Sequence, residues 1–215
     1  SAGLEVPREG RGPPRVDNSN LYALVDKACQ WFQARLREQP EAIDYLRDRG
    51  VSGEIARDFA IGFAPSGWDG LLTALGTNDI IRQQMLTVGL VSQGDKGLYD
   101  KFRQRIIFPI HDRRGRVIAF GGRALTDQGP KYLNSPETPV FHKGRELYGL
   151  YEARRRKTKL IRVLVVEGYM DVLALAQFGI GYSVATLGTA TSKDHIDRLF
   201  RLVPQIVFCF DGDGA

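Results

Sequence analysis

The sequence predicts an α/β protein in which a basic, mainly helical α+β part precedes a parallel β-α-β-α-β unit. Apolar residues recur at helical spacing over the first half of the chain, from Leu21 onward. Two short apolar runs then flank a polar turn, which is typical of a pair of strands. After residue 160, β-branched runs alternate with helical patterns. This alternation predicts a parallel sheet with right-handed crossovers.

The composition is that of a folded, water-soluble chain. Its 215 residues, 43% hydrophobic and 26% charged, suffice for one large domain or two modest ones. No run approaches the roughly 18 to 20 apolar residues of a membrane-spanning helix, and the first residues lack the layout of a secretory signal. We therefore expect a cytoplasmic protein that does not contact a membrane.

The first half of the chain is expected to consist of a linker and helices. Residues 1–18 contain three prolines, three glycines and little to bury, and they predict a flexible linker that follows another folded module. Ser19 or Asn20 is a candidate cap for the first helix. The apolar spacing then predicts helices over 21–36, from Pro40 to Gly50, from Ser52 to Phe59, over 71–75 and over 79–87.

The second half is expected to contain a strand pair and then the β-α-β-α-β unit. Strands over 105–110 and 117–120 flank the polar turn 112–116, and a short helix is expected over 151–157. The β-branched run 160–166 begins a second domain, so the predicted divisions are 19–159 and 160–215. Within that domain the pattern predicts a helix over 170–178, a strand over 183–186, a helix over 193–202 and a strand over 206–210.

Positive charge is concentrated in the middle of the chain. The net charge is +5, but residues 101–160 alone contain 15 Lys and Arg against 5 Asp and Glu. Such a pattern is expected where one surface binds a polyanion, for which nucleic acid or a nucleotide is the natural candidate. A solvated basic face is the alternative interpretation.

The cysteines and histidines do not indicate a disulfide or a metal site. Cys29 and Cys209 are far apart and neither has a neighbour that would make a ligand pair. We expect both to be core thiols. His111, His142 and His195 show no metal-ligand spacing.

Acidic residues follow two strands of the predicted parallel unit. Glu167 comes directly after the first strand, and Asp211 and Asp213 come after the third. Ligands of parallel sheets collect at the carboxyl ends of the strands, so these carboxylates are expected to converge. Asp171 lies one helical turn past Glu167 as a candidate fourth. Hard divalent cations such as Mg²⁺ or Mn²⁺ would neutralise such a cluster.

Less specific interpretations exist for each of these patterns. The Glu167-Gly168 pair could form an ordinary turn. The stretch 211–214 is similar to the opening of a calcium-binding loop, but a strand precedes it where that loop needs a helix. The stretch 187–193 lacks the Gly-Lys-Ser/Thr ending of a phosphate loop, which favours a plain helix cap.

Two stretches together resemble a known family. VVEGYMD (165–171) and FCFDGD (208–213), placed across a β-α-β-α-β segment, resemble the Toprim domain of topoisomerases and primases. Among Toprim proteins the chain looks most like the bacterial DnaG-type DNA primase. That resemblance extends upstream through residues 100–110, 120–123, 131–138 and 141–144.

The resemblance implies an RNA polymerase that makes short primers on a single-stranded DNA template from ribonucleoside triphosphates. It implies that Glu167, Asp211 and Asp213 are catalytic and, with Asp171, bind Mg²⁺ or Mn²⁺. Phosphoryl transfer requires charge neutralisation, which metals held by carboxylates provide. The residues implied to guide template and nucleotide are Arg103, Arg105, Arg123, Lys131, Tyr132, Asn134 and Lys143.

The family has further parts that this sequence does not contain. They are an amino-terminal zinc-binding module, a carboxy-terminal helicase-binding module and a second acidic pair after the first Asp-x-Asp. We therefore expect zinc and the replicative helicase to bind outside this chain, with a single-strand binding protein as a further partner at the replication fork in the nucleoid. The fragment alone is expected to have little or no polymerase activity.

Two rival functions use the same features. A Toprim nuclease or topoisomerase would use the carboxylates to cleave DNA, but the basic segment and the lack of an identifiable tyrosine nucleophile argue against it. A non-catalytic module that binds single-stranded DNA or a nucleotide would retain the basic segment without chemistry.

Overall fold

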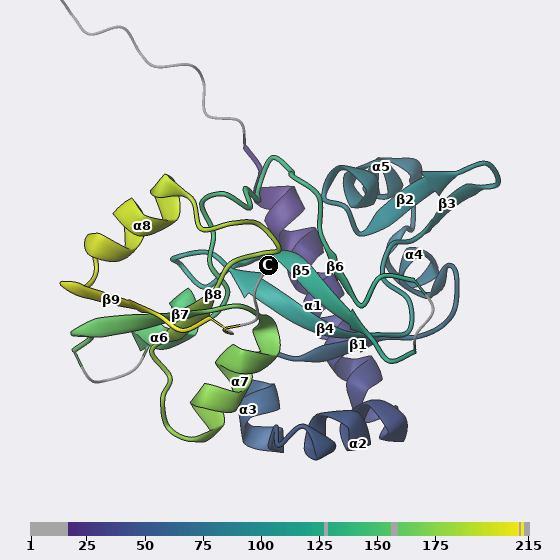
Figure 1. Cartoon of the computed structure of the whole chain (residues 1–215). Helices are drawn as coiled ribbons and strands as arrows, with labels where there is room; N and C mark the ends of the chain where they lie inside the picture. Colours follow the sequence, from purple (N-terminus) through teal and green to yellow (C-terminus); the bar gives the residue numbers. More distant parts are fainter. Residues whose placement is uncertain (1–16, 127–128, 156–158, 211, 213–215) are drawn as a thin grey trace, which may run out of the picture.

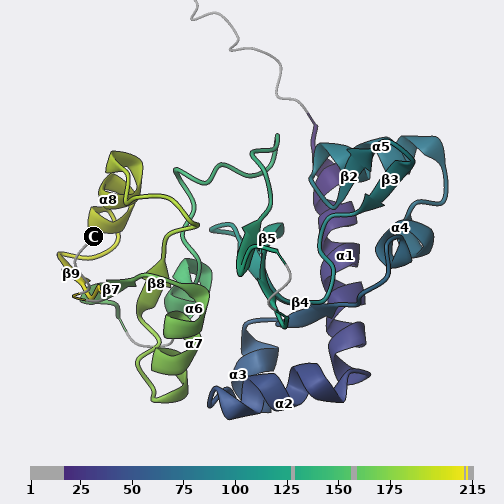
Figure 2. The same cartoon turned by 45° about the vertical axis from the view of Figure 1, so that its right-hand side comes forward.

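Figure 1 shows a computed structural model of the chain, in which residues 17–126, 129–155, 159–210 and 212 are described. They form two parts that lie side by side, each built around its own sheet. The turned view in Figure 2 separates the parallel sheet on the left from the antiparallel sheet and its helices on the right. No helix among the described residues is long and apolar enough to cross a membrane.

The helices of the first part confirm the predicted order. They are α1 (Ser19–Arg37), α2 (Pro40–Asp48), α3 (Gly53–Asp58), α4 (Gly70–Leu75) and α5 (Asp79–Thr87). The Ser52 hydroxyl accepts a hydrogen bond from the Ile55 N–H at 3.3 Å, which confirms the predicted cap of α3. The expected cap of α1 was wrong by one residue, because the N-cap is Asn18 and the helix already begins at Ser19.

An antiparallel sheet forms the centre of the first part. Its order is β1-β4-β5-β6, and a separate hairpin pairs β2 with β3. The sequence predicted β4 and β5 but not the other four strands, which have only three or four residues each. The strands are β1 (Gly62–Ala64), β2 (Val91–Gly94), β3 (Gly97–Asp100), β4 (Arg105–His111), β5 (Val117–Ala124) and β6 (Tyr132–Asn134).

The second part contains the predicted parallel unit. The sheet order is β8-β7-β9, with both pairings parallel, so β7 is central. Its elements, with the helix that leads into them, are α6 (Leu150–Arg155), β7 (Arg162–Val166), α7 (Tyr169–Gln177), β8 (Ser183–Ala185), α8 (Lys193–Phe200) and β9 (Gln205–Phe208). The predicted end of the short helix over 151–157 falls partly outside the described residues.

The two parts share one hydrophobic core. Phe108 of β4 stacks on Tyr169 of α7 with ring centroids 4.9 Å apart, and Tyr148 meets the same ring edge-on at 4.8 Å. The backbone of Tyr148 also pairs with that of Ala185 in β8. The second part is therefore anchored to the first by buried aromatic contacts, and the division at residue 160 stays a prediction.

The two cysteines differ in their surroundings. Cys29 is a core thiol, as predicted, and burial raises its pKa to about 12, which makes it unreactive. The prediction for Cys209 was wrong, because its side chain is exposed. Cys209 follows β9, which lies at the edge of the described sheet with β7 as its neighbour.

Candidate active site and template surface

Glu167 and Asp171 lie at the carboxyl edge of the parallel sheet. Glu167 is the exposed residue that directly follows β7, and α7 begins two residues later. The Asp171 carboxylate turns back and accepts the Gly168 N–H at 2.9 Å. This hydrogen bond closes the first turn of α7, so Asp171 fixes the loop that presents Glu167.

The register of β9 brings the third strand to the same edge. Phe208 is level with Val165 of β7, and the Cys209 N–H donates to the Val165 carbonyl oxygen at 2.9 Å. The chain therefore leaves β9 beside the residue pair that precedes Glu167. Asp211 and Asp213 lie outside the described residues, and their convergence on Glu167 stays a prediction.

The donors at this edge suit a hard cation. Glu167 and Asp171 offer exposed carboxylate oxygens, the ligand type that Mg²⁺ and Mn²⁺ prefer. Among the residues that the structure describes, no group of three or more His, Cys, Asp or Glu side chains is placed to hold a metal. Two of the four predicted ligands fall outside that part of the chain.

Asn134, the last residue of β6, links the antiparallel sheet to the carboxylate edge. Its side-chain oxygen accepts the Tyr169 hydroxyl at 2.6 Å, and its side-chain nitrogen donates to the Leu187 carbonyl at 2.9 Å. Tyr169 begins α7, two residues after Glu167, and Leu187 lies in the loop after β8. Asn134 was predicted to contact template or nucleotide. The structure gives its amide an internal role, and direct contact stays a prediction.

Replacing Asn134 with Ala should lower the free energy of unfolding by about 1–3 kcal/mol, because the Tyr169 hydroxyl and the Leu187 carbonyl lose their partner in a largely buried place. Urea unfolding of the chain, followed by circular dichroism, measures the difference. Asn20→Ala is the matched control, since that side chain is exposed on α1. Equal stability of the two variants would show that the link does not hold the two parts together.

Arg123, Lys131 and Tyr132 lie together next to this link. Arg123 of β5 is level with Tyr132 of β6, and Lys131 and Tyr132 are exposed. The Arg123 guanidinium lies over the ring of Tyr45 at 4.5 Å, and Arg49 of the same helical region lies over that ring at 5.6 Å. The sequence therefore predicted Arg123, Lys131 and Tyr132 as part of a cluster of cations and aromatic rings. The tertiary fold adds Tyr45 and Arg49 to that cluster.

Arg103 and Arg105 line a cavity of about 630 Å³. Arg103 is stacked on Trp68, with its guanidinium 4.1 Å from the ring centroid. Arg105 is buried, and its guanidinium donates to the carbonyls of Gly122 and Lys131, at 3.4 Å in each case. Burial, and the nearby charge of Arg103, lower the pKa of Arg105. Arg103 is thus the half-exposed member of the predicted pair, and Arg105 braces the strands.

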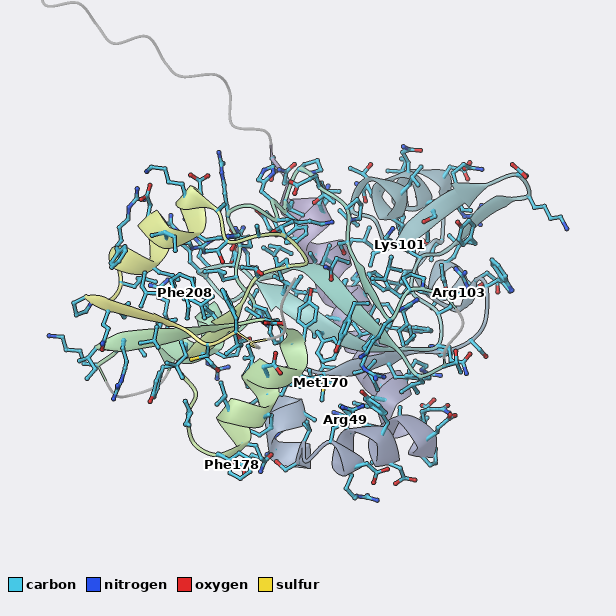
Figure 3. All side chains as sticks on the ribbon, viewed as in Figure 1. Arg49, Lys101, Arg103, Met170, Phe178 and Phe208 are labelled. Atoms are coloured by element: carbon cyan, nitrogen blue, oxygen red, sulfur yellow. The ribbon has the colours of Figure 1, made fainter. Side chains whose placement is uncertain are left out.

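Lys101 extends this basic surface toward Lys143. Burial and the charge of Lys143 lower the pKa of Lys101, so the two ammonium groups lie within electrostatic reach of each other. The backbone of Lys143 is fixed on both sides, because its N–H donates to Glu137 at 2.8 Å and its carbonyl accepts from His195 at 2.9 Å. In Figure 3 the labelled Lys101 and Arg103 of the first part lie above and to the right of the labelled Met170 of α7.

The sequence reasoning missed several residues of this surface. They are Tyr45, Arg49, Trp68, Tyr99, Lys101 and Gln104. Gln104 has a positive φ of 49°, which is uncommon for a residue with a side chain and marks a constrained position at the cavity. Basic and aromatic residue types were visible in the sequence. These residues come together from α2, from β3 and from the loop before α4, and that arrangement depends on the fold.

The chain matches two protein families in consecutive segments. Residues 31–154 match the DNA primase catalytic core, N-terminal domain. Residues 162–215 match the Toprim domain. The first match covers α2 to α5, the antiparallel sheet and all of the predicted basic surface, and the second covers the parallel unit with its carboxylate edge.

Curated relatives cover the whole chain at high identity. The DNA primase of Pseudomonas aeruginosa is 58% identical over 100% of this chain and 34% of its own length. The DNA primase of Escherichia coli K12 is 52% identical over 99% of the chain and 38% of its own length. The chain thus spans about a third of the length of these relatives.

Solved primase structures have the same fold. The E. coli primase catalytic core superposes with a TM-score of 0.86 at 54% identity, over 90% of this chain and 63% of that one. A DNA primase domain from P. aeruginosa gives a TM-score of 0.86 at 60% identity, over 90% and 62%. Together with the two family matches, these relatives show that the chain belongs to the family of bacterial DnaG-type DNA primase catalytic cores.

Proposed function

We propose that this chain forms part of an enzyme that synthesises short RNA primers on single-stranded DNA for chromosome replication. The observation that carries the proposal is the link from Asn134 to Tyr169 and Leu187. It holds the turn that presents Glu167 against β6, which begins at Tyr132, directly after Lys131. A carboxylate edge and a basic surface in one rigid arrangement are what nucleotidyl transfer along a template requires.

Each part of the surface has a proposed task. Glu167, Asp211 and Asp213, with Asp171 in support, would hold Mg²⁺ or Mn²⁺. A bound divalent cation would supply charge neutralisation of the triphosphate and activation of the attacking 3′-hydroxyl. Lysines and arginines hold phosphates without reading bases, which suits an enzyme that copies many sequences. Tyr132 offers an exposed ring on which a base can stack.

Similar proteins support the choice of template. One solved relative, with a TM-score of 0.86 and 53% identity, is a DnaG primase catalytic domain bound to single-stranded DNA. Another, from Mycobacterium tuberculosis, is in complex with a double-stranded DNA oligomer that has a 6-nucleotide overhang. By analogy we assign single-stranded DNA and ribonucleoside triphosphates to this chain. Action at the replication fork, and contact there with a helicase and a single-strand binding protein, belong to the same proposal.

One incubation separates the three candidate functions. A protein of the relatives' full length that contains this chain is mixed with single-stranded DNA, ribonucleotides and Mg²⁺ or Mn²⁺. Short RNA products that depend on template and metal are expected from a primase. Cleaved DNA would instead identify a nuclease, and DNA binding without either product would identify a non-catalytic module.

Changing Lys131 and Lys143 to Ala together should weaken binding of a single-stranded oligonucleotide and flatten its salt dependence. Each phosphate contact on a single strand contributes about 0.7 to the slope of log K against log salt, so the loss of two predicts a decrease of about 1.4. Fluorescence anisotropy at several salt concentrations measures it. Lys27 and Lys96, exposed elsewhere, provide the matched double variant. An unchanged slope would mean that Lys131 and Lys143 do not touch phosphate.

A further inference from the structure

A second polar cavity, of about 760 Å³, lies between the two parts of the molecule and outside the surface described above. Its walls come from the start of α1, the turn between β4 and β5, the segment before α6, α6 itself and α8. We call it the arginine groove, after the six arginines that line it: Arg113, Arg116, Arg145, Arg154, Arg198 and Arg201.

One face of α8 forms a whole wall of the groove. The lining residues 194, 197 and 198 of the helix, with 201 and 202 directly after it, have the spacing of a single helix face. The opposite face buries His195 and Leu199 in the core. The helix is therefore anchored on its apolar side, and it presents a fixed row of charged side chains to the groove. Figure 1 shows α8 at the upper left, apart from the antiparallel sheet.

The carboxylates of the groove are already occupied. Asp112 accepts hydrogen bonds from the Arg116 side chain and from two backbone N–H groups, and these interactions lower its pKa despite partial burial. Each of the other three is paired with a cation as well. The four ion pairs are Asp112 with Arg116 at 2.7 Å, Glu146 with Arg198 at 2.7 Å, Asp194 with Arg145 at 3.4 Å and Asp197 with Lys193 at 2.5 Å.

Three of the six arginines of the groove take no part in these four ion pairs. Arg113, Arg154 and Arg201 are exposed and come from three different elements, and their guanidinium groups have no ion-pair or hydrogen-bond partner within the described part of the chain. The groove therefore keeps an uncompensated positive charge while its acidic groups are satisfied internally. Planar guanidinium groups bind phosphate oxygens in pairs of hydrogen bonds, and this geometry makes phosphate the ligand that the three arginines suit best.

The arginine groove is separate from the cavity that Arg103 and Arg105 line. Arg105, in the other cavity, lies at the start of β4, and the turn that carries Arg113 follows the end of that strand. Six residue steps of extended chain correspond to roughly 20 Å. The two cavities share no lining residue. In the parallel sheet, Arg201 precedes β9 and so lies toward the edge opposite Glu167.

We propose that the arginine groove binds phosphate groups, either of a free polyphosphate such as a nucleoside triphosphate or of a nucleic acid strand away from the catalytic edge. Both ligands offer the same chemistry, a series of anionic oxygens that the exposed guanidinium groups of the groove can bind. The groove has a volume of about 760 Å³. Arg113, Arg154 and Arg201 provide the binding charge, and the four ion pairs keep the walls in place.

The test compares the wild-type chain with the triple variant R113A/R154A/R201A. Inorganic tripolyphosphate is titrated by calorimetry, and a labelled single-stranded oligonucleotide is titrated by anisotropy at several salt concentrations. Loss of charge-assisted hydrogen bonds to three arginines should weaken the affected ligand by about tenfold or more. If the strand is the ligand, the salt slope should also fall by about 2, at 0.7 for each lost phosphate contact. R37A/R47A/R57A removes three exposed arginines elsewhere and is the matched control.

The outcomes distinguish the two sources of phosphate. Weaker tripolyphosphate binding alone assigns the groove to a free polyphosphate, and a lower oligonucleotide slope assigns it to a strand. A triple variant that behaves like its control with both ligands overturns the proposal. The variant leaves Lys131 and Lys143 in place, so failure here is distinct from failure of the template surface.

A variant that is expected to bind phosphate more tightly controls for a loss of binding that is caused by misfolding. Asp194→Asn with Asp197→Asn removes two negative charges from the groove wall and releases Arg145 from its ion pair. Phosphate binding should then become tighter than in the wild type. Misfolding does not produce such a gain, and unchanged or weaker binding by this variant would contradict the proposal.

Discussion

Replacing Glu167 with Gln should abolish primer synthesis while the protein stays folded. Gln keeps the shape of the side chain but loses the charge, so a divalent cation loses a ligand and the triphosphate loses charge neutralisation. Removal of a single group that stabilises transition-state charge typically costs about 10²–10³ in rate. Glu167 is exposed after β7, so the change removes no buried packing. RNA product formed by a protein of the relatives' full length, with Mg²⁺ or Mn²⁺ present, measures the loss.

Two controls define this result. Glu54→Gln changes an exposed carboxylate at the start of α3 and should leave synthesis unchanged. Thermal unfolding of Glu167→Gln should match that of the wild type. If synthesis survives in Glu167→Gln, Glu167 is not catalytic, and the family's mechanism would have to use other residues in this chain.

Replacing Gly121 with Ala should both destabilise the protein and impair synthesis. A Cβ atom at Gly121 would lie 2.4 Å from the Tyr169 ring carbon Cζ and 2.5 Å from its hydroxyl oxygen. The ring would have to leave its stack on Phe108 and its hydrogen bond to Asn134. Overpacking of this kind costs about 1–3 kcal/mol of unfolding free energy. Urea unfolding measures the stability, and the primer yield of a protein of the relatives' full length measures the effect on the Glu167 turn.

Gly144→Ala is the matched control for this change. No heavy atom lies within 4 Å of the Cβ that it would add, and φ at Gly144 is not positive. Its stability and primer yield should stay close to those of the wild type. Should Gly121→Ala prove as stable and as active as Gly144→Ala, the Tyr169 ring would not be the element that positions the carboxylate edge.

The sequence by itself determined the longer helices and the parallel unit. A helix of nine or more residues repeats its apolar face, so α1, α2 and α5 were visible as periodic patterns. The β-branched run before Glu167 buries Val163, Val165 and Val166, as a central parallel strand does. The acidic residues that follow these strands could also be identified from the sequence, because their position relative to a strand depends only on neighbouring residues.

Local information failed for four strands of the first part and for Cys209. β1, β2, β3 and β6 have three or four residues and form because neighbouring strands supply their hydrogen bonds. Cys209 lies in an apolar run that suggested burial, but exposure depends on what packs against β9. A residue type and its neighbours in the chain do not contain that information.

Only the tertiary structure decided how the candidate site is assembled. Asn134 and Tyr169 are 35 positions apart in sequence and meet through a hydrogen bond that joins the two parts. Arg113, Arg154 and Arg201 line one groove although they come from three elements. The sequence predicted phosphate and metal binding, because those predictions rest on residue types and on the residues that follow strands. Which charges are paired and which remain available depends on packing between distant segments, and packing is set by the whole fold.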